Sequence, residues 1–213
     1  MSTILQQLST SIIDGDEEKS PELVQKALDQ GLVPIEILDN GLLPGMNEVS
    51  KRFEREEMFV PEVLLAAKAM HDGLEVLRPH LVETGNEPIG RIVLGTVKGD
   101  IHDIGKNLVG MMCEGAGFEV INLGFDVDPE QFIEAVKEKQ PDIIGMSAML
   151  TTTMIAMGYT IKALKEENLR DSVKVIVGGA PVDSETVERI GADGYAYNGP
   201  TAVKLVKHLL DVG

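Results

Sequence analysis

The spacing of apolar residues changes once along the chain, close to residue 90. Before that point, apolar residues recur three and four positions apart, which is the period of an amphipathic helix. The pattern predicts a bundle of four helices near residues 2–13, 20–30, 34–55 and 60–81. Helix ends or breaks are expected at the glycines and prolines of this region, namely Asp14-Gly15, Gly31, Gly41, Pro44-Gly45 and Pro61.

From Arg91 onward, short apolar runs alternate with amphipathic stretches. The runs are RIVLGTV, FEVINLG, DIIGMSA, VKVIVGGA and GYAYN, and the stretches lie near 104–116, 129–139, 154–168, 183–190 and 200–211. Five successive strand–helix units predict an α/β fold with a doubly wound, flavodoxin-like parallel sheet of five strands. The segment VETGNEPIG at 82–90 has neither period and is interpreted as a linker. We therefore expect a helical-bundle domain over residues 1–85 and a Rossmann-like domain over residues 90–213.

Composition and charge narrow the possible functions. Hydrophobic residues make up 43% of the 213 residues, but no apolar run is long enough to cross a bilayer, and the N-terminus has no basic region followed by an apolar one. We expect a soluble, cytoplasmic protein. The single cysteine, Cys113, excludes an internal disulfide and is expected to be a buried apolar side chain. The net charge of −16 opposes binding to nucleic acid or to an anionic membrane.

The residues that are candidates for a functional site lie where the strands of the sheet are expected to end. Asp100 and His102 follow the first strand, residues 147–153 close and follow the third, and Gly178-Gly179 ends the fourth. Ligands of parallel sheets bind beyond the carboxyl ends of the strands, at the point where the strand order reverses. If the order is 2-1-3-4-5, the first and third strands are neighbours, and their loops flank one crevice.

The segment KGDIHDIGKN at 98–107 is ambiguous on its own. A phosphate-binding loop needs four residues between its glycines and a Ser or Thr after the lysine, whereas here five residues separate Gly99 from Gly105 and an asparagine follows the lysine. The G-x-G-x-x-G of a dinucleotide site is absent after the first strand. Asp-x-His suits a metal ligand better, since a carboxylate that accepts the second ring proton of a histidine fixes its tautomer. Only one histidine is near, so the metal would have to bring its other ligands with it, as in a macrocycle.

These motifs resemble a known family. DIHDIG, SAMLTTT and VIVGG resemble the D-x-H-x-x-G, S-x-L and G-G motifs in the cobalamin-binding domain of methionine synthase and its relatives. The helical region before them, with MFVPEVLLAAKAM, resembles the four-helix cap of the same proteins. The likeness spans about residues 5–212, and a free-standing cap plus cobalamin domain of this length is similar to the corrinoid proteins of anaerobic methyltransferase systems.

The resemblance implies a role for each motif position. His102 would be the lower axial ligand of cobalt in place of the dimethylbenzimidazole of the cofactor, and Asp100 and Thr153 would form a proton relay to it. Met149 and Val60 stand where the family has leucine, and Gly199 where it has alanine. The other cofactor-binding positions that the resemblance implies are Ile101, Asp103, Gly105, Ser147, Met149, Thr151, Gly178, Gly179 and Gly199 around the corrinoid and its tail, and Phe53 and Val60 over its upper face. Without the resemblance, Phe59 would be expected in the core of the bundle.

The function that the resemblance implies is that of a methyl carrier and not of an enzyme. A cobalamin or related corrinoid, methylcobalamin in the loaded state, would take a methyl group from a substrate methyltransferase and hand it to a second methyltransferase, with tetrahydrofolate or coenzyme M as acceptor. A reductive activator is a further expected partner. A mutase subunit that uses adenosylcobalamin shares D-x-H-x-x-G but lacks the helical cap, and a cobalamin-sensing regulator would need a DNA-binding module. Methylamines, methanol, betaines and methoxylated aromatics are all open as methyl donors.

Overall fold

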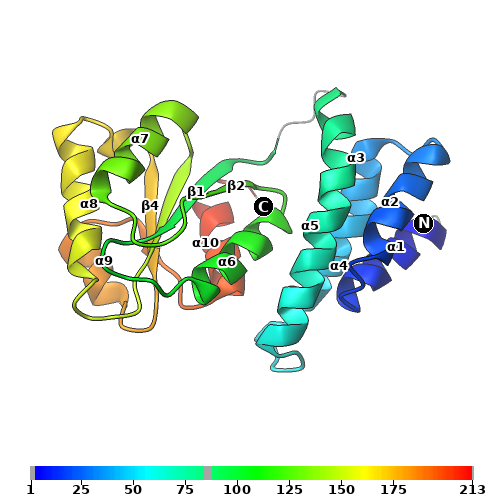
Figure 1. Cartoon of the computed structure of the whole chain (residues 1–213), viewed down its shortest axis with the longest axis horizontal. Helices are drawn as coiled ribbons and strands as arrows, with labels where there is room; N and C mark the ends of the chain where they lie inside the picture. The colour runs from blue at the N-terminus through cyan, green and yellow to red at the C-terminus, as the bar shows by residue number, and fades with distance from the viewer. Residues whose placement is uncertain (1–2, 84–87, 213) are drawn as a thin grey trace. The chain divides into compact units, whose positions relative to one another are not determined.

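In the computed structural model, which describes residues 3–83 and 88–212, the chain forms two compact units (Figure 1). The helical unit consists of the residues up to Pro88 together with Glu114–Gly117, and the sheet unit consists of Ile89–Cys113 and Phe118–Gly213. Residues 84–87, which belong to the predicted linker, lie outside the described residues. None of the helices in the described part of the chain has the length and apolar composition needed to cross a membrane.

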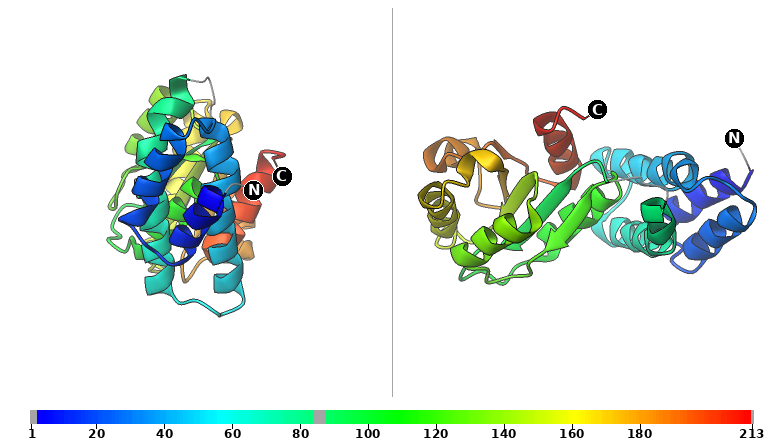
Figure 2. Two further views of the ribbon diagram at one scale, coloured as in Figure 1. Left: turned by 90° about the vertical axis from the view of Figure 1, so that its right-hand side faces the viewer. Right: turned by 90° about the horizontal axis from the view of Figure 1, so that it is seen from above.

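The helical unit is built from α1 (Thr3–Ile13), α2 (Lys19–Asp29), α3 (Pro34–Ile37), the π-helical turn η1 (Leu38–Leu42), α4 (Leu43–Glu54) and α5 (Val60–Glu83). Helix α1 packs on α4, and α2 packs on α5 (Figure 2). Apolar residues three and four positions apart are buried together, so the unit has a core of its own. This core includes Leu5, Leu8, Ile12, Val24, Ala27, Met46, Val49, Val63, Ala67, Met70 and Leu77. The predicted four-helix bundle is confirmed.

The predicted helix over residues 34–55 contains a π-helical turn. In this turn the N–H of Leu43 donates to the carbonyl oxygen of Leu38, five residues earlier. Pro44, which has no N–H, then falls in the first turn of α4, where a backbone donor has no partner inside the helix. The chain therefore stays helical through the proline, at the expense of one wider turn.

The breaks predicted at Gly41 and at Pro44-Gly45 are wrong, and packing explains these glycines instead. A Cβ atom on Gly41 would lie 2.7 Å from Leu8, and one on Gly45 would lie 2.7 Å from Ile12. Both neighbours belong to α1. The two glycines, four residues apart, therefore let α1 approach η1 and the start of α4 closely.

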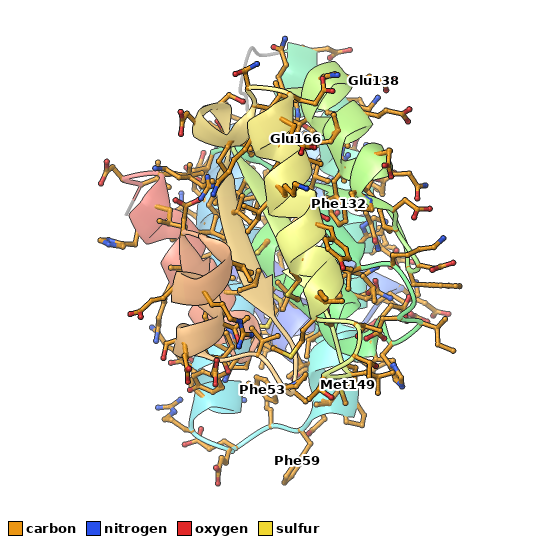
Figure 3. All side chains as sticks on the ribbon, turned by 90° about the vertical axis from the view of Figure 1, so that its left-hand side faces the viewer. Phe53, Phe59, Phe132, Glu138, Met149 and Glu166 are labelled. Atoms are coloured by element: carbon orange, nitrogen blue, oxygen red, sulfur yellow. The ribbon has the colours of Figure 1, made fainter. Side chains whose placement is uncertain are left out.

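Phe59 is a second correction, because its side chain is 69% exposed and is not part of the core (Figure 3). The residue immediately precedes α5. Its N–H donates to the Glu62 carboxylate at 2.8 Å, and the Glu62 N–H donates to its carbonyl oxygen at 3.0 Å. This reciprocal capping fixes the backbone at the start of the helix and leaves the ring outside the core of the bundle.

The sheet unit alternates strands and helices along the chain. Its elements are β1 (Arg91–Thr96), α6 (Ile104–Glu114), β2 (Glu119–Asn122), α7 (Pro129–Lys139), β3 (Ile143–Ser147), α8 (Ile155–Glu166), the 3-10 turn η2 (Arg170–Ser172), β4 (Lys174–Gly178), α9 (Ser184–Ile190), β5 (Gly194–Tyr195) and α10 (Gly199–Leu209). All neighbouring strands are parallel, and their order is β2-β1-β3-β4-β5. This order and the predicted fold class are confirmed.

Helices cover both faces of this sheet, with α7, α8 and α9 on one face and α6 and α10 on the other (Figure 1). Successive strand residues point to opposite faces, which explains why the strands are apolar throughout. Val93, Ile144 and Val175 belong to the core under α7 and α8, whereas Leu94 lies on the α6 face, 3.2 Å from where a Cβ on Gly110 would be. Cys113 on α6 is buried, as predicted.

Candidate functional site

The carboxyl ends of three neighbouring strands bring the predicted residues to one edge of the sheet unit. In the sheet register, Thr96 at the end of β1 pairs with Ser147 at the end of β3, and Ser147 pairs with Gly178 at the end of β4. In Figure 3, Met149 lies at this edge, and Glu138 and Glu166, near the C-terminal ends of α7 and α8, lie at the opposite edge. The loops after β1, β3 and β4 are therefore adjacent.

The carboxylate of Asp100 joins the loop after β1 to the loop after β3. It is fully buried. Its Oδ1 accepts from the backbone N–H of His102 at 3.0 Å and from the His102 ring nitrogen Nδ1 at 2.8 Å. Its Oδ2 accepts from the Met149 N–H at 2.7 Å, from the Thr153 hydroxyl at 2.7 Å and from the Leu150 N–H at 3.3 Å. The structure thus brings together the three predicted residues Asp100, His102 and Thr153.

The surroundings of Asp100 favour the charged form of its carboxyl group. Burial alone would raise its pKa, but hydrogen bonds from Met149, Thr153 and His102 outweigh this effect and hold the pKa well below its usual range. An ionised carboxylate can only accept hydrogen bonds, so Nδ1 of His102 must carry a proton. The neutral ring then presents the lone pair of Nε2, the nitrogen that can bind a metal.

Exposed apolar side chains flank His102, whose own side chain is 53% exposed. Ile101 and Ile104 are about 70% exposed, and Met149 and Leu150 are also exposed. Among the described residues, no group of three or more His, Cys, Asp or Glu side chains could hold a metal ion. An apolar rim around a single accessible nitrogen suits a large organic ring that carries a metal with its other ligands. The residues present fit a corrinoid.

The other predicted positions fall into two groups. At the carboxyl edge, Ile101, Asp103 and Gly105 lie between β1 and the first turn of α6, Ser147 ends β3, and Met149 and Thr151 are exposed in the loop before α8. Phe53 near the end of α4 and Val60 at the start of α5 belong to the helical unit. A Cβ on Gly105 would meet open space, so nothing in the protein itself requires glycine there.

Three predicted glycines have packing reasons inside the sheet unit. A Cβ on Gly178 would lie 2.7 Å from the carbonyl oxygen of Ala196, and one on Gly179, whose φ is +125°, would overlap the carbonyl oxygen of Ala148. Gly199 is buried, and a Cβ there would overlap the sulfur of Met112. Cofactor binding by these glycines stays a prediction.

Sequence reasoning missed two residues that support the loop carrying His102, namely Asp126 and Lys106. The loop after β2 contributes Asp126, whose N–H donates to the Asp100 carbonyl oxygen at 3.0 Å and whose Oδ1 accepts from the Gly99 N–H at 2.8 Å. Lys106, the lysine of the segment that superficially resembles a phosphate loop, is buried. The one signal in the sequence is the Lys-Asn pair that directly follows the D-x-H-x-x-G motif.

Comparison with known proteins assigns the family. The B12 binding domain family matches residues 90–206, and a second B12 binding domain family matches residues 4–78. A corrinoid protein of Desulfitobacterium hafniense is 46% identical over 98% of both chains. The chain belongs to the B12-binding corrinoid proteins. A dimethylamine corrinoid protein of Methanosarcina barkeri is 47% identical to this corrinoid protein over 97% of both chains. The methanol:cobalamin methyltransferase complex MtaBC from Methanosarcina barkeri matches with a TM-score of 0.87 at 28% identity, over 98% of this chain and 80% of that one.

Membership of this family confirms several predictions. The cofactor is cobalamin or a related corrinoid, and the chain is a corrinoid protein of methyltransferase systems and not an enzyme. The methyl donor, the methyl acceptor and the roles of the single residues stay predictions.

Proposed function

We propose that this corrinoid protein carries a methyl group from a substrate-specific methyltransferase to a second methyltransferase, whose acceptor is tetrahydrofolate or coenzyme M. The bound corrinoid supplies a cobalt centre that takes up and releases the methyl group, while the protein binds, orients and shields it. The likeness to the methyltransferase complex supports a methyltransferase as partner. The 47% identity to a dimethylamine corrinoid protein supports a methylated amine as donor. A reductive activator is the third partner we propose.

We propose that Nε2 of His102 is the protein ligand of cobalt. The observation that carries this proposal is the 2.8 Å contact between Nδ1 and Asp100, because it orients the ring and leaves Nε2 unprotonated in the neutral form. The ring is also accessible, since 53% of the side chain is exposed beside apolar neighbours. Ser147, Thr151, Gly178 and the neighbouring strand-end residues would hold the nucleotide tail.

Asp100 and Thr153 would control the ring proton. The second proton of a charged ring sits on Nε2, and it must leave before this nitrogen can bind cobalt. The Thr153 hydroxyl lies 2.7 Å from Asp100 Oδ2 and 2.9 Å from the carbonyl oxygen of Leu150, and its single proton can serve only one of them. It can therefore donate to the carboxylate while the ring is neutral and turn to Leu150 while the ring is charged.

Replacement of His102 tests the ligand. We expect the wild-type protein, reconstituted with cobalamin and reduced to cobalt(II), to show nitrogen superhyperfine splitting from a protein histidine in its electron paramagnetic resonance spectrum. His102→Ala should lose this splitting, because Nε2 is removed while the fold around it is kept.

The matched control is His208→Ala, which removes a histidine from α10. This variant should keep the wild-type spectrum. If protein-nitrogen splitting persisted in His102→Ala, a different residue would be the ligand and the proposal would be wrong.

A further inference from the structure

Lys106 is a buried cation that the proposed ligand set does not use. It lies in the first turn of α6 and is 4% exposed. Its Nζ donates to Oδ1 of Asn122 at 2.7 Å and to the carbonyl oxygen of Gly124 at 2.8 Å, and both acceptors are neutral. Burial lowers the pKa of the Lys106 ammonium, and the charge of Asp103 opposes this shift. Burial of a cation against neutral acceptors costs desolvation free energy. The hydrogen bonds that Lys106 donates must offset part of this cost.

Lys106 fixes the turn that follows β2. The Gly124 carbonyl oxygen, which accepts from Lys106, also accepts from the Thr96 N–H at 3.0 Å. Oδ1 of Asn122, the other acceptor, also accepts from the Gly124 N–H at 3.0 Å. The ammonium, the turn and the end of β1 are therefore one hydrogen-bonded assembly.

The loop after β2 also forms hydrogen bonds with the loop that carries His102, residues 97–103, which we call the histidine loop. Two residues after Gly124, Asp126 donates its N–H to the Asp100 carbonyl oxygen and accepts the Gly99 N–H on its carboxylate. The Thr96 hydroxyl donates to the carbonyl oxygen of His102 at 3.1 Å. The backbone is thus fixed on both sides of Asp100.

A second branch of the network leads back to the histidine loop. Nδ2 of Asn122 donates to Oδ1 of Asn107 at 3.0 Å, and Nδ2 of Asn107 donates to Oδ2 of Asp103 at 3.0 Å. Asp103 directly follows His102. Lys106 is therefore connected to the residues before and after the proposed ligand.

We propose that Lys106 is a positioning residue: by holding the turn after β2, it fixes the loop that presents His102. This role accounts for Lys106 and Asn107, which follow the D-x-H-x-x-G motif and which no phosphate site explains. The consequence for cobalt ligation rests on the function proposed above. The rigidity of the loop in the cofactor-free protein does not depend on that function.

An ordinary stabilising role would have a different signature, and the chain offers a matched control. Arg170 is another largely buried cation, with 16% of its side chain exposed, and it donates to Asp193 and to the carbonyl oxygens of Val173 and Gly191. It precedes β4, at the opposite edge of the sheet. Loss of Arg170 should weaken the sheet unit without loosening the histidine loop.

The first test uses amide hydrogen exchange, followed by NMR, in the cofactor-free protein. We expect Lys106→Met to speed exchange at Gly99, His102 and Asp126 by about tenfold or more relative to wild type, which corresponds to a fall of about 1.4 kcal/mol in the local opening free energy. Arg170→Met should leave these three amides unchanged. Equal acceleration in both variants, or none in Lys106→Met, would overturn the proposal. Should Lys106→Met not fold, the exposed Asn122→Ala removes one acceptor and is expected to give the same pattern.

The second test uses cobalamin-loaded protein in the cobalt(II) state. The fraction of cobalt that shows histidine nitrogen splitting should fall in Lys106→Met and stay at the wild-type value in Arg170→Met. A wild-type fraction in Lys106→Met, despite faster exchange, would overturn the link to ligation. Absence of the splitting from the wild type itself would refute the proposed ligation of cobalt by His102 and leave the role of Lys106 in holding the loop intact.

Discussion

At the scale of single residues, the site depends on one buried carboxylate that accepts hydrogen bonds from two loops. Asp100 accepts from backbone N–H groups of His102, Met149 and Leu150, from the His102 ring and from the Thr153 hydroxyl. Hydrogen bonds to a charged group are the strong ones, and an amide in its place would turn an NH₂ group toward other donors. The same side chain therefore orients the proposed ligand and ties the loops together.

We expect Asp100→Asn to destabilise the cofactor-free protein by about 2–3 kcal/mol near neutral pH. The pKa of Asp100 is lower in the folded protein than in the unfolded chain. Its contribution is therefore fully present above the unfolded pKa of about 3.9 and is lost as the pH falls toward the folded value. The difference in unfolding free energy between wild type and variant should shrink below about pH 4, as measured by urea unfolding across the acid range.

Asp171→Asn, at an exposed carboxylate in η2, is the control for this prediction. It removes a negative charge without touching the site and should change stability by less than about 0.5 kcal/mol. An Asp100→Asn penalty that stayed constant or grew on acidification would show that the carboxylate is not stabilised in its charged form.

The pair Asp100 and His102 was predictable from spacing and Thr153 from the family resemblance, whereas the backbone donors to the carboxylate were not. Met149 and Leu150 donate to Asp100 through backbone N–H groups, which every residue except proline possesses. The amino-acid types at these two positions therefore do not reveal the contacts. The burial of Lys106 was hidden for a related reason. Its acceptors lie 16 and 18 positions away, and only the folded chain brings them to the lysine.

At the scale of elements, glycine is found at the carboxyl edge of the sheet for two different reasons. Gly179 has a φ of +125° and no room for a Cβ, so the protein itself requires glycine there. Gly105, in the first turn of α6, has nothing within 4 Å of an added Cβ. If Gly105 is important, its importance must come from a ligand that approaches the backbone.

We expect Gly179→Ala and Gly105→Ala to separate folding from binding. Gly179→Ala should lower the unfolding free energy by about 2 kcal/mol or more, because backbone strain and overlap with Ala148 act together. Gly105→Ala should leave stability within about 0.5 kcal/mol of wild type but weaken corrinoid binding. Urea unfolding of the cofactor-free protein and equilibrium titration with cobalamin measure the two effects. Unchanged corrinoid affinity in Gly105→Ala would remove this residue from the site.

Element order was more predictable than local helix geometry. Alternating strand and helix patterns favour right-handed crossovers, and these leave few possible strand orders. The observed order is the one on which the predicted adjacency of the loops after β1 and β3 depended. The π-helical turn at Leu38–Leu42 did not follow, because Gly41 and Pro44-Gly45 look like breaks when packing against α1 is unknown. The core position expected for Phe59 was wrong for a similar reason, because this apolar residue lies at the start of a helix and not on its buried face.

At the scale of the whole molecule, the chain joins two units that each bury their own core. Units of this kind can change their relative position as rigid bodies without losing internal contacts. We propose that the helical unit covers the upper face of the corrinoid through Phe53 and Val60 and moves aside when a methyltransferase binds. A partner can open such a cover only by its preference for the open state, so the contact must be modest in free energy.

We expect the double variant Phe53→Ala/Val60→Ala, loaded with methylcobalamin, to lose methyl groups to light faster than the wild type, because the cobalt–carbon bond is light-sensitive and its cover would be smaller. Its dissociation constant for the corrinoid should change by less than about tenfold, or about 1.4 kcal/mol, since binding would rest mainly on His102 and the tail site. Photolysis rates followed by visible absorption, together with titration, measure both quantities. The control is Leu65→Ala, which removes an exposed apolar side chain from α5 outside the pair and should leave both unchanged. A double variant that lost the corrinoid while the remaining bound fraction photolysed at the wild-type rate would make the helical unit a structural support for binding and not a cover.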